Sequence, residues 1–338
     1  MSNVTMKEIA KLAGVSPATV SRTFKSPDLV DERTRLRIMQ IAEQQNYIYN
    51  AAAGSLSSQK STLIGVLIPS ANKSFYGKSL IAIQDKAQEL GFSIIIGNTK
   101  YDHRVERKLI EQFLQNRVAG MILTGYHLKN KNYIKQFLKK GPPCVFTWEK
   151  LEGEAYSYVG FDNFAAAFSV TEYLVGLKHR RIGLFIGPYF KMNRVKHRFD
   201  GYRAALEKYK IPFDPDLVYE RDPNFTEGKE AMGALLSREN PPTAIFAASD
   251  SLAIGAMAAA RQQGVRVPED ISIAGFDDIE FAAFCEPPLT TVRVPAYEMG
   301  MHAMTCLSEM INGTSDQVRQ YHLDTDLIIR KSCTEYGQ

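Results

Sequence analysis

The chain has few cysteines and no long uninterrupted apolar run. Its 338 residues include four cysteines, which have neither the spacing of metal ligands nor the density of a disulfide framework. No apolar run is long enough to span a membrane, and the N-terminus lacks the pattern of a signal peptide. These absences predict a cytoplasmic protein with reduced thiols at Cys144, Cys285, Cys306 and Cys333.

Sequence signatures of catalysis are also missing. No phosphate-binding loop occurs, and Gly183 and Gly187 flank an apolar run without completing the dinucleotide fingerprint. The six histidines are scattered and form no catalytic or metal-binding cluster. His179, which stands beside two arginines, is expected to be solvated. We therefore expect no enzymatic activity, no cofactor and no metal.

The excess of positive charge is small and unevenly placed. Of a formal net charge of +4, +3 falls in residues 1–60, which hold eight lysines and arginines against five aspartates and glutamates. This is compatible with contacts to nucleic-acid phosphates, although a solvated basic face is the simpler alternative. The length exceeds what one compact core accommodates and predicts two or three domains.

The stretch TMKEIAKLAGVSPATVSR near the N-terminus predicts two short helices. Thr5 and Glu8 match a capping box at a helix start, and Gly14 ends that helix because glycine tolerates the left-handed conformation. Ser16 is then the N-cap and Pro17 the first residue of the second helix. Such a pair forms a helix-turn-helix, whose second helix can enter the DNA major groove. An ordinary helical hairpin is the alternative.

A third helix is expected from Asp31 to about Gln45. Asp31 is suited to cap it, and its apolar residues recur at helical spacing. Three arginines lie on the exposed side of this helix, where phosphate contact and plain solvation are both open: Arg33, Arg35 and Arg37.

From Leu63 onward, short apolar runs alternate with helical patterns. LIGVLIP is typical of a strand buried on both faces, and three more strands are expected before residue 150. A second series begins at 158–162 and continues to a strand at 271–277. Strands that alternate with helices of this length form parallel sheets with right-handed crossovers. We therefore predict an α/β fold of two doubly wound parallel-sheet lobes, preceded by an all-α headpiece.

The end of the chain is expected to cross back between the lobes. A strand at 290–294, a helix at 296–311 and a last strand near 326–330 carry this crossing. The first lobe then comprises about 62–160 and 291–321, and the second about 161–290 and 322–338.

Over essentially its whole length the chain resembles the LacI/GalR family of bacterial transcription repressors. The resemblance rests on VTMKEIAKLAGVSPATVSR, VDERTR, NYIYN and LIGVLIP. It implies a helix-turn-helix headpiece in residues 1–48, a hinge segment in 49–61, and an effector-binding and dimerisation domain in 62–338. The domain is expected to have the architecture of periplasmic binding proteins.

The resemblance also implies which residues of the second helix contact DNA. Pro17, Ala18 and Arg22 match the positions that read operator bases. Arg22 suits guanine because a guanidinium donates to O6 and N7 together. Hydroxyl groups suit phosphate oxygens, which position a protein without specifying sequence; the hydroxyls expected to do so belong to Ser16, Thr19 and Ser21.

The hinge segment is implied to form a helix on the operator. Leu56 would then insert into the minor groove, where an apolar wedge unstacks a base step and bends the duplex. Two residues depart from the family pattern. Tyr49 stands where proline is usual, and Gly54 weakens a helix by about 1 kcal/mol relative to alanine.

Ligands of doubly wound lobes bind outside the carboxyl ends of the strands. In the first lobe, the residues that follow strands include aromatic side chains, which are common in small-molecule sites; the candidates are Phe75, Tyr76, Lys100, Thr124 and Trp148. Trp148 matches a ligand-contact position at which the family often has aspartate. For Phe75 and Tyr76, packing at a helix start is the alternative.

In the second lobe the resemblance implies effector contacts at Arg198, Asp277, Phe225 and Ser249. An arginine and an aspartate that face one cleft together hold a polyol. Arg194, with two nearby lysines, raises the alternative of an anionic effector such as a sugar acid or sugar phosphate. Asp250 is expected to cap the helix that starts beside it.

These observations predict a homodimeric DNA-binding transcription regulator, most simply a repressor. Its two-fold symmetry would match a palindromic operator, and a sugar-like metabolite between the lobes would change its DNA affinity. A small-molecule binding protein or transport receptor without DNA function is the alternative, against which the headpiece motif and the missing signal peptide count. Induction and corepression are both allowed.

Overall fold

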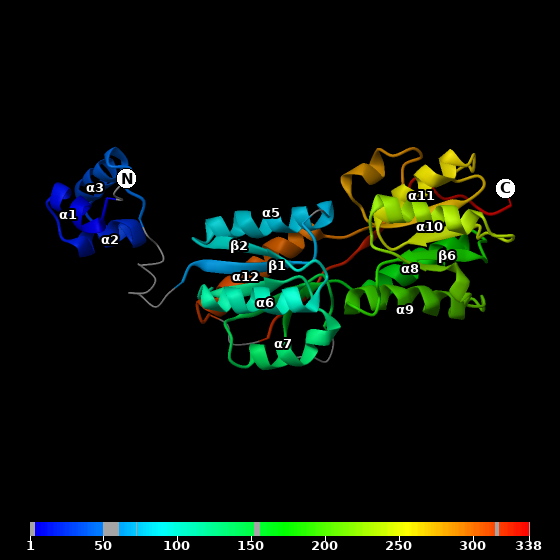
Figure 1. Ribbon diagram of the computed structural model, residues 1–338, viewed down its shortest axis with the longest axis horizontal. Coiled ribbons are helices and arrows are strands. Elements are labelled where there is room, and N and C mark those ends of the chain that lie inside the picture. Colours follow the sequence, from blue (N-terminus) through cyan, green and yellow to red (C-terminus); the bar gives the residue numbers. More distant parts are fainter. Residues whose placement is uncertain (1–3, 50–60, 72, 152–155, 315–317, 338) are drawn as a thin grey trace. The chain divides into compact units, whose positions relative to one another are not determined.

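The computed structural model describes residues 4–49, 61–71, 73–151, 156–314 and 318–337 (Figure 1). The chain forms two compact units, Met1–Thr62 and Leu63–Gln338, and each has a hydrophobic core of its own. Within the described ranges, no helix combines the length and the apolar character needed to cross a bilayer.

The first unit opens with the predicted capping box. In α1 (Met6–Ala13) the Glu8 amide donates to the Thr5 hydroxyl, and the Glu8 carboxylate accepts from the Thr5 amide at 2.6 Å. Gly14 ends the helix at φ 64°, in the left-handed region that glycine tolerates. The helix therefore begins and ends where the sequence predicts.

α2 (Pro17–Lys25) follows directly, with Ser16 as the predicted N-cap; the Ser16 hydroxyl accepts from a backbone amide at 3.1 Å. A 3₁₀ turn (Pro27–Leu29) leads to α3 (Glu32–Gln44), which Asp31 caps. The apolar stripes of the three helices meet in a small core made of Ile9, Ala10, Ala13, Val20 and Ile38.

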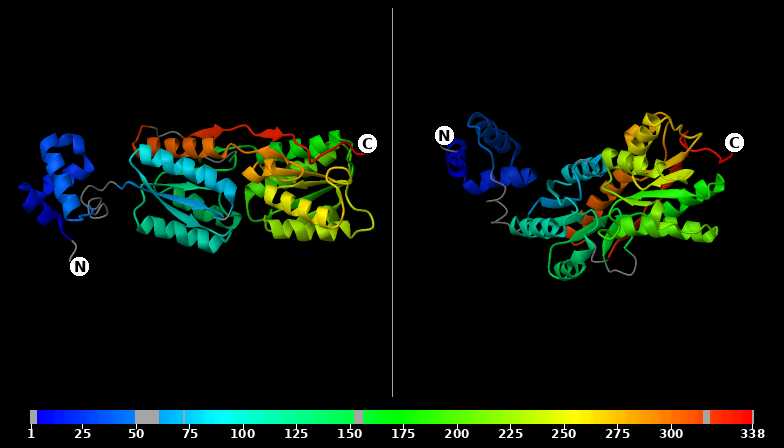
Figure 2. Two further views of the ribbon diagram at one scale, coloured as in Figure 1. Left: turned by 90° about the horizontal axis from the view of Figure 1, so that it is seen from above. Right: turned by 45° about the vertical axis from the view of Figure 1, so that its right-hand side comes forward.

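The second unit consists of two lobes, each built on a six-stranded sheet with helices on both faces (Figure 2). In the first lobe the strand order is β11-β5-β4-β3-β1-β2, and every pairing is parallel. Helices α5 and α12 lie side by side on one face, with α6 on the other (Figure 1). The elements are β1 (Leu63–Ile68), α5 (Ser74–Glu89), β2 (Ser93–Asn98), α6 (His103–Gln115), β3 (Gly120–Leu123), a 3₁₀ turn (Leu128–Asn130), α7 (Lys131–Leu138), β4 (Cys144–Thr147), β5 (Ser157–Gly160), α12 (Ala296–Ile311) and β11 (Gln320–His322).

The second lobe has the strand order β12-β10-β9-β8-β6-β7. Only β12 is antiparallel to its neighbour within this sheet. Helices α8 and α9 cover one face, and α10 and α11 the other (Figure 1). The elements are α8 (Asn163–Gly176), β6 (Ile182–Ile186), α9 (Asn193–Lys208), a 3₁₀ turn (Pro215–Leu217), β7 (Val218–Glu220), α10 (Phe225–Leu236), β8 (Ala244–Ala247), α11 (Asp250–Gln262), β9 (Ser272–Asp277), a 3₁₀ turn termed η4 (Glu280–Ala283), β10 (Thr290–Arg293) and β12 (Asp326–Ile328).

Glycine allows close approach where the helices of the second lobe cross. A Cβ atom on Gly201 of α9 would lie 2.3 Å from the Phe164 carbonyl oxygen of α8. A Cβ atom on Gly255 of α11 would lie 2.1 Å from the Phe225 carbonyl oxygen of α10. Only glycine fits such contacts, which let the two helices of each pair pack closely against each other.

The chain distributes its strands between the lobes differently from the prediction. The strand at the start of the second series is β5, which lies within the bounds given for the first lobe and pairs with β4 in the first sheet. Residues from 291 were assigned to the first lobe, but β10 pairs with β9 and β12 in the second sheet. The chain therefore crosses back after Arg293. A local apolar pattern predicts a strand but does not say beside which strand it lies, and this is decided by tertiary packing.

His179 is buried and not solvated. Its ring is hydrogen-bonded to the hydroxyls of Thr243 at 2.9 Å and Ser272 at 3.0 Å, and to the Thr334 carbonyl at 3.1 Å. Burial lowers its pKa. The two adjacent arginines suggested solvation, but the C-terminal segment covers this position and is hydrogen-bonded to the ring through the Thr334 carbonyl.

Candidate functional site

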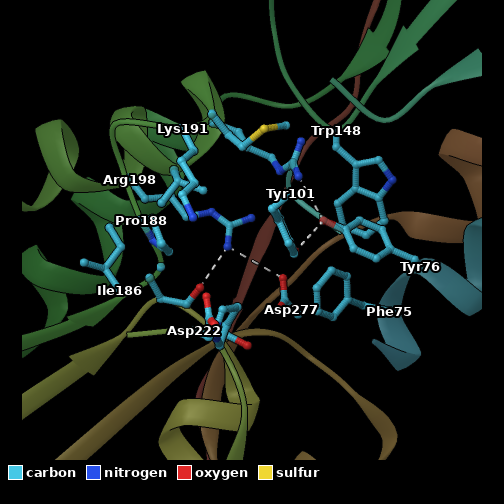
Figure 3. A pocket seen from close by; sticks show the side chains of 17 residues that line it. Phe75, Tyr76, Tyr101, Trp148, Ile186, Pro188, Lys191, Arg198, Asp222 and Asp277 are labelled. Atoms are coloured by element: carbon cyan, nitrogen blue, oxygen red, sulfur yellow. Dashed lines mark hydrogen bonds and ion pairs between the residues drawn. The ribbon is translucent and has the colours of Figure 1, made fainter. Parts of the chain in front are cut away.

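A pocket lies between the two lobes of the second unit, beside the ends of their strands (Figure 3). Both lobes contribute side chains, so any ligand in this pocket contacts the two lobes together. Seven of the ten residues predicted to contact an effector line it: Phe75, Tyr76, Trp148, Arg194, Arg198, Ser249 and Asp277.

The first lobe supplies an aromatic wall, which consists of Phe75, Tyr76, Tyr101 and Trp148. The rings of Phe75 and Tyr76 are 4.4 Å apart, and the Trp148 ring lies 5.4 and 4.9 Å from them. The hydroxyls of Tyr76 and Tyr101 are 3.5 Å apart. Figure 3 shows the side chains of Phe75, Tyr76 and Trp148 on one side of the pocket, with Tyr101 nearer its middle. Such a wall suits a flat ring or the apolar face of a sugar.

Trp148 is held by its backbone as well as by packing. It follows β4 with φ 74°, an uncommon conformation for a side-chain-bearing residue. Its amide donates to the Met299 sulfur at 3.1 Å, and its carbonyl accepts from the Asn163 side chain at 2.9 Å. Asn163 belongs to α8 of the second lobe, so this side of the aromatic wall is tied to both lobes.

Arg198 and Asp277 face each other in the second lobe. The guanidinium donates to the Asn163 side chain at 2.8 Å and to the Ala248 carbonyl at 2.9 Å, and it stacks 3.7 Å from the Phe276 ring centroid. Its Nη1 lies 3.8 Å from the Asp277 carboxylate. These contacts within the protein hold the Arg198 side chain in one orientation without a ligand.

Asp277 has acceptors that the protein does not use. Both carboxylate oxygens are buried and make no hydrogen bond of ordinary geometry with any described residue, although the neighbouring Ser249 hydroxyl is close enough to lower the pKa of Asp277. Burial raises the pKa of Asp277 to about 7, although Arg198 opposes the rise. Buried polar atoms without partners are costly, so these groups are ready to accept hydrogen bonds from a ligand.

Arg194 of α9 extends from the second lobe into the first. Its Nη1 donates to the Thr124 carbonyl at 2.9 Å, and its Nη2 donates to the Tyr76 hydroxyl at 3.0 Å. The side chain is buried. Both terminal amino groups are thus used to join the lobes, which is a different role from a direct effector contact.

Glu149 lies close to this arginine. A Cβ atom on Gly125 would be 2.7 Å from Arg194 Nη1 and 2.9 Å from Glu149 Oε1, so both groups lie next to a position that glycine must occupy. The Glu149 oxygens are buried and make no hydrogen bond of ordinary geometry within the described part of the chain. Burial raises the pKa of Glu149 to about 7, with Arg194 opposing.

The backbone also connects the lobes beside the pocket. His127, after β3, forms an isolated antiparallel bridge with Met192, at the start of α9. The Leu128 amide donates to the Lys191 carbonyl at 2.9 Å. Behind this bridge, the buried Glu106 carboxylate accepts from the His127 amide. Sequence patterns did not indicate these contacts, because they depend on how closely the lobes approach.

Three predicted effector residues are not in the pocket lining. Lys100 is exposed, and its left-handed backbone places the neighbouring Tyr101 in the pocket in its stead. Thr124 is buried, and its carbonyl is taken by Arg194. Phe225 starts α10 with half of its surface exposed, while the preceding residues Asp222 and Pro223 line the pocket.

Sequence reasoning missed several lining residues. Asp222 follows β7, a three-residue strand too short to be recognised from its pattern. Tyr101 is one position from the predicted Lys100, and the positive φ angles of both residues were not predictable from composition. Lys191 is one of the two lysines near Arg194 that raise the alternative of an anionic effector, and it lines the pocket. Its place after β6 was the available signal.

Asp250 does not cap α11 as predicted. Ser249 occupies the N-cap position and makes no side-chain capping bond. The Asp250 carboxylate accepts from the Ile279 amide at 2.8 Å and from the Thr291 hydroxyl at 2.5 Å. Asp250 therefore supports the loop that follows β9, and Asp277 is the last residue of that strand.

In the first unit, the predicted base-reading residues share the outward side of α2. Pro17, Ala18 and Arg22 are all exposed. Ser16 is exposed, but its hydroxyl contacts Thr19 Oγ1 at 2.9 Å as well as capping the helix. The Ser21 hydroxyl lies 3.3 Å from that of Tyr49. Leu56 falls outside the described residues.

Comparisons with known families match both units. The model of the family described as bacterial regulatory proteins, lacI family, matches residues 5–50. The model of the periplasmic binding protein-like domain matches residues 171–333.

Relatives and solved structures match along almost the entire chain. The chain is 35% identical over 328 residues to the HTH-type transcriptional repressor CytR of Escherichia coli (strain K12), covering 97% of this chain and 96% of the relative. It is 31% identical to the ribose operon repressor of Haemophilus influenzae, with 97% and 98% covered. The crystal structure of the lac repressor dimer bound to operator and the anti-inducer ONPF is similar, with a TM-score of 0.86, 28% identity and coverage of 98% and 100%.

Proposed function

This chain belongs to the lacI family of bacterial regulatory proteins and is a DNA-binding transcriptional repressor with a ligand-binding domain. We propose that it binds a palindromic operator as a homodimer and that a neutral polyhydroxylated effector controls this binding. The proposal places its action in the cytoplasm. The observation that carries the effector part is the buried Asp277 carboxylate opposite the aromatic wall, whose oxygens make no hydrogen bond of ordinary geometry with any described residue.

The proposed operator interface is the outward side of α2. Arg22 is exposed there and is assigned to guanine, because its guanidinium can donate to O6 and N7 at once. Pro17 and Ala18 offer apolar contact, for instance to a thymine methyl group. Ser16, Thr19 and Ser21 supply hydroxyls for phosphate oxygens, which orient the helix without reading bases.

A homodimer is supported by apolar side chains left exposed on the second unit. Ile81 of α5 and Ile96 of the edge strand β2 are half exposed, and Phe281 and Phe284, in and directly after η4, are 69% and 81% exposed. Such side chains are suited to burial against a second chain, and the similar lac repressor structure is a dimer. A two-fold dimer presents two α2 helices to half-sites about one helical turn apart, which is why a palindrome is proposed.

The effector is assigned as neutral because both buried arginines of the pocket already have acceptors, and the lining pairs its remaining cation, Lys191, with a second carboxylate, Asp222. Arg194 donates to Thr124 and Tyr76, and Arg198 donates to Asn163 and Ala248. Neither arginine therefore offers both of its terminal amino groups for bidentate binding of a carboxylate or phosphate. Asp277 instead needs donors, which sugar hydroxyls supply. A sugar acid or sugar phosphate would bring a second anion to that carboxylate.

Coupling follows from the position of the pocket between the lobes. An effector that contacts both the aromatic wall and Asp277 binds more tightly when the two lobes are in contact than when they have moved apart. The same difference changes DNA affinity by thermodynamic linkage. Induction and corepression both satisfy this relation, and the sign is an experimental outcome.

The DNA part is tested by selection from randomised duplexes with the full-length protein. Enriched sites with two-fold symmetry are expected. Enriched sites without symmetry would contradict the dimeric arrangement, and absence of enrichment would favour a binding protein that does not act on DNA.

The effector part is tested by a thermal-shift screen against neutral sugars, glycosides, nucleosides, sugar acids and sugar phosphates. A ligand that binds the native state raises the melting temperature by mass action. We expect shifts from neutral compounds. Shifts confined to sugar acids or phosphates would contradict the neutral assignment.

A further inference from the structure

Tyr49 packs back onto α2 and does not continue outward from α3. The chain leaves α3 through Asn46, which has a left-handed φ of 50°, and the Tyr47 amide donates to the Ala42 carbonyl at 2.8 Å. The Tyr49 ring then stacks on Phe24 of α2, with centroids 5.2 Å apart and an interplanar angle of 9°. The segment that leaves the headpiece is thereby attached to the helix proposed to enter the groove.

The stacking brings two hydroxyls together at the surface. Tyr49 Oη lies 3.3 Å from Ser21 Oγ, and both residues are partly exposed. Each hydroxyl has one proton to donate. Their mutual hydrogen bond uses one of the two protons, so the pair retains one donor for an external acceptor. If the external acceptor replaces the mutual bond, both hydroxyls can donate to it.

We propose that Tyr49 and Ser21 together bind one backbone phosphate of the DNA, so that Tyr49 is a DNA-contacting residue. The inference rests on the proposed placement of α2 on the operator and extends it to a residue that the sequence assigned only to the hinge. Ser21 adjoins Arg22, the proposed base-reading residue, so a phosphate held here sets the depth and register of that arginine.

The ring stack has a separate consequence for this site. A phenylalanine at position 49 would cover Phe24 equally well, so packing alone does not account for the hydroxyl beside Ser21. Because the stack orders the tyrosine before DNA arrives, its hydroxyl loses little side-chain freedom on binding. Hydroxyl donors carry no charge, and they therefore strengthen binding without releasing counterions in the way lysine and arginine do.

The test uses the full-length protein with a duplex enriched by selection and with a scrambled duplex of equal length. Tyr49→Phe keeps the ring and removes the hydroxyl, and Ser21→Ala removes its partner. We expect each variant to bind both duplexes roughly ten- to hundredfold more weakly, as for loss of one hydrogen bond in each half-site. The dependence of affinity on salt concentration should be unchanged. The double variant should lose less than the product of the two single losses, because one phosphate is shared.

Thr23→Val is the matched control. Thr23 is also on α2, but it is buried and its hydroxyl donates to the Thr19 carbonyl, so its removal should not weaken DNA binding in the same salt-independent way.

Two results would overturn the inference while leaving the proposed function intact. One is native DNA affinity in Tyr49→Phe together with weakened binding and a lower headpiece melting temperature in Tyr49→Ala, which would make Tyr49 a packing residue only. The other is full additivity of the two single losses, which would mean separate contacts. Failure of the native protein to bind any duplex would overturn the proposed function as well, and it is recognised by the same failure in every variant.

Discussion

Arg194 of the second lobe donates a 3.0 Å hydrogen bond to the Tyr76 hydroxyl of the first lobe. The same guanidinium reaches the Thr124 carbonyl and lies beside the buried Glu149. One side chain therefore joins the lobes and forms part of the pocket between them. This arrangement makes lobe contact, carboxylate ionisation and ligand binding physically dependent on one another.

Replacing Arg194 by methionine should loosen the contact between the lobes. The variant loses two buried hydrogen bonds and leaves Glu149 without its nearby cation, so the free energy of unfolding should fall by about 2–4 kcal/mol. Urea denaturation measures this loss. Adding Glu149→Gln should restore part of it, because the buried charge is gone. Lys196→Met, on the exposed side of the same helix, is the control; equal stability of Arg194→Met and that control would contradict the assignment.

Asp277→Asn should weaken effector binding while leaving effector-free DNA binding intact. Hydrogen bonds to a charged group contribute about 1.5–3 kcal/mol, so the dissociation constant of a neutral ligand found in the screen should rise roughly 10- to 150-fold. Isothermal titration calorimetry gives this number. Asp324→Asn, at a fully exposed carboxylate, should bind as the native protein does. Unchanged affinity in Asp277→Asn would remove this residue from the effector site.

Effector affinity should depend on pH near neutrality. Burial raises the pKa of Asp277 to about 7, and the ionised carboxylate is the better acceptor for ligand hydroxyls. The association constant should therefore increase as the pH rises through about 7 and then level off. Asp277→Asn should show a flatter profile, and calorimetry between pH 6 and 8.5 compares the two. A native profile that falls across this range would contradict the proposed contact.

The stability of the effector-binding unit should fall as the pH rises from about 4 to about 7. Asp277 and Glu149 both have pKa values raised to about 7 by burial, against ordinary unfolded values near 4. The folded state thus binds more protons than the unfolded state in that window, and its stabilisation is lost as these groups ionise. Urea titrations at several pH values should show a smaller fall in the Asp277→Asn and Glu149→Gln variants than in the native protein.

Arg22→Ala should weaken operator recognition without affecting the pocket. A bidentate contact to guanine discriminates by about 1–3 kcal/mol, so the ratio of affinities for the selected and scrambled duplexes should fall roughly 5- to 150-fold for each half-site. Fluorescence anisotropy with both duplexes measures this ratio, and effector affinity should be unchanged. Arg104→Ala, an exposed arginine of α6, is the control. A preserved ratio in Arg22→Ala would show that another residue reads the bases.

The headpiece could be predicted in detail because its determinants are local. The capping box of Thr5 and Glu8, the left-handed Gly14 and the cap at Ser16 act within a few residues of one another, and periodicity alone identifies the stripe that forms the core. The alternation of apolar runs and helices likewise predicted two parallel α/β lobes. Seven pocket residues were found because strand ends and family motifs identify them.

Other features depended on contacts between distant segments. β5 and β10 have ordinary strand patterns, and only packing assigns them to a sheet. His179 is buried because residue 334 lies over it, and Tyr101 enters the pocket because two consecutive residues have positive φ angles. The sequence by itself therefore determined the helix-turn-helix, the fold class and the family. Tertiary structure alone decided that Arg194 joins the lobes, that Asp277 has unused acceptors, and that Tyr49 reaches Ser21, because each depends on groups brought together across long stretches of chain.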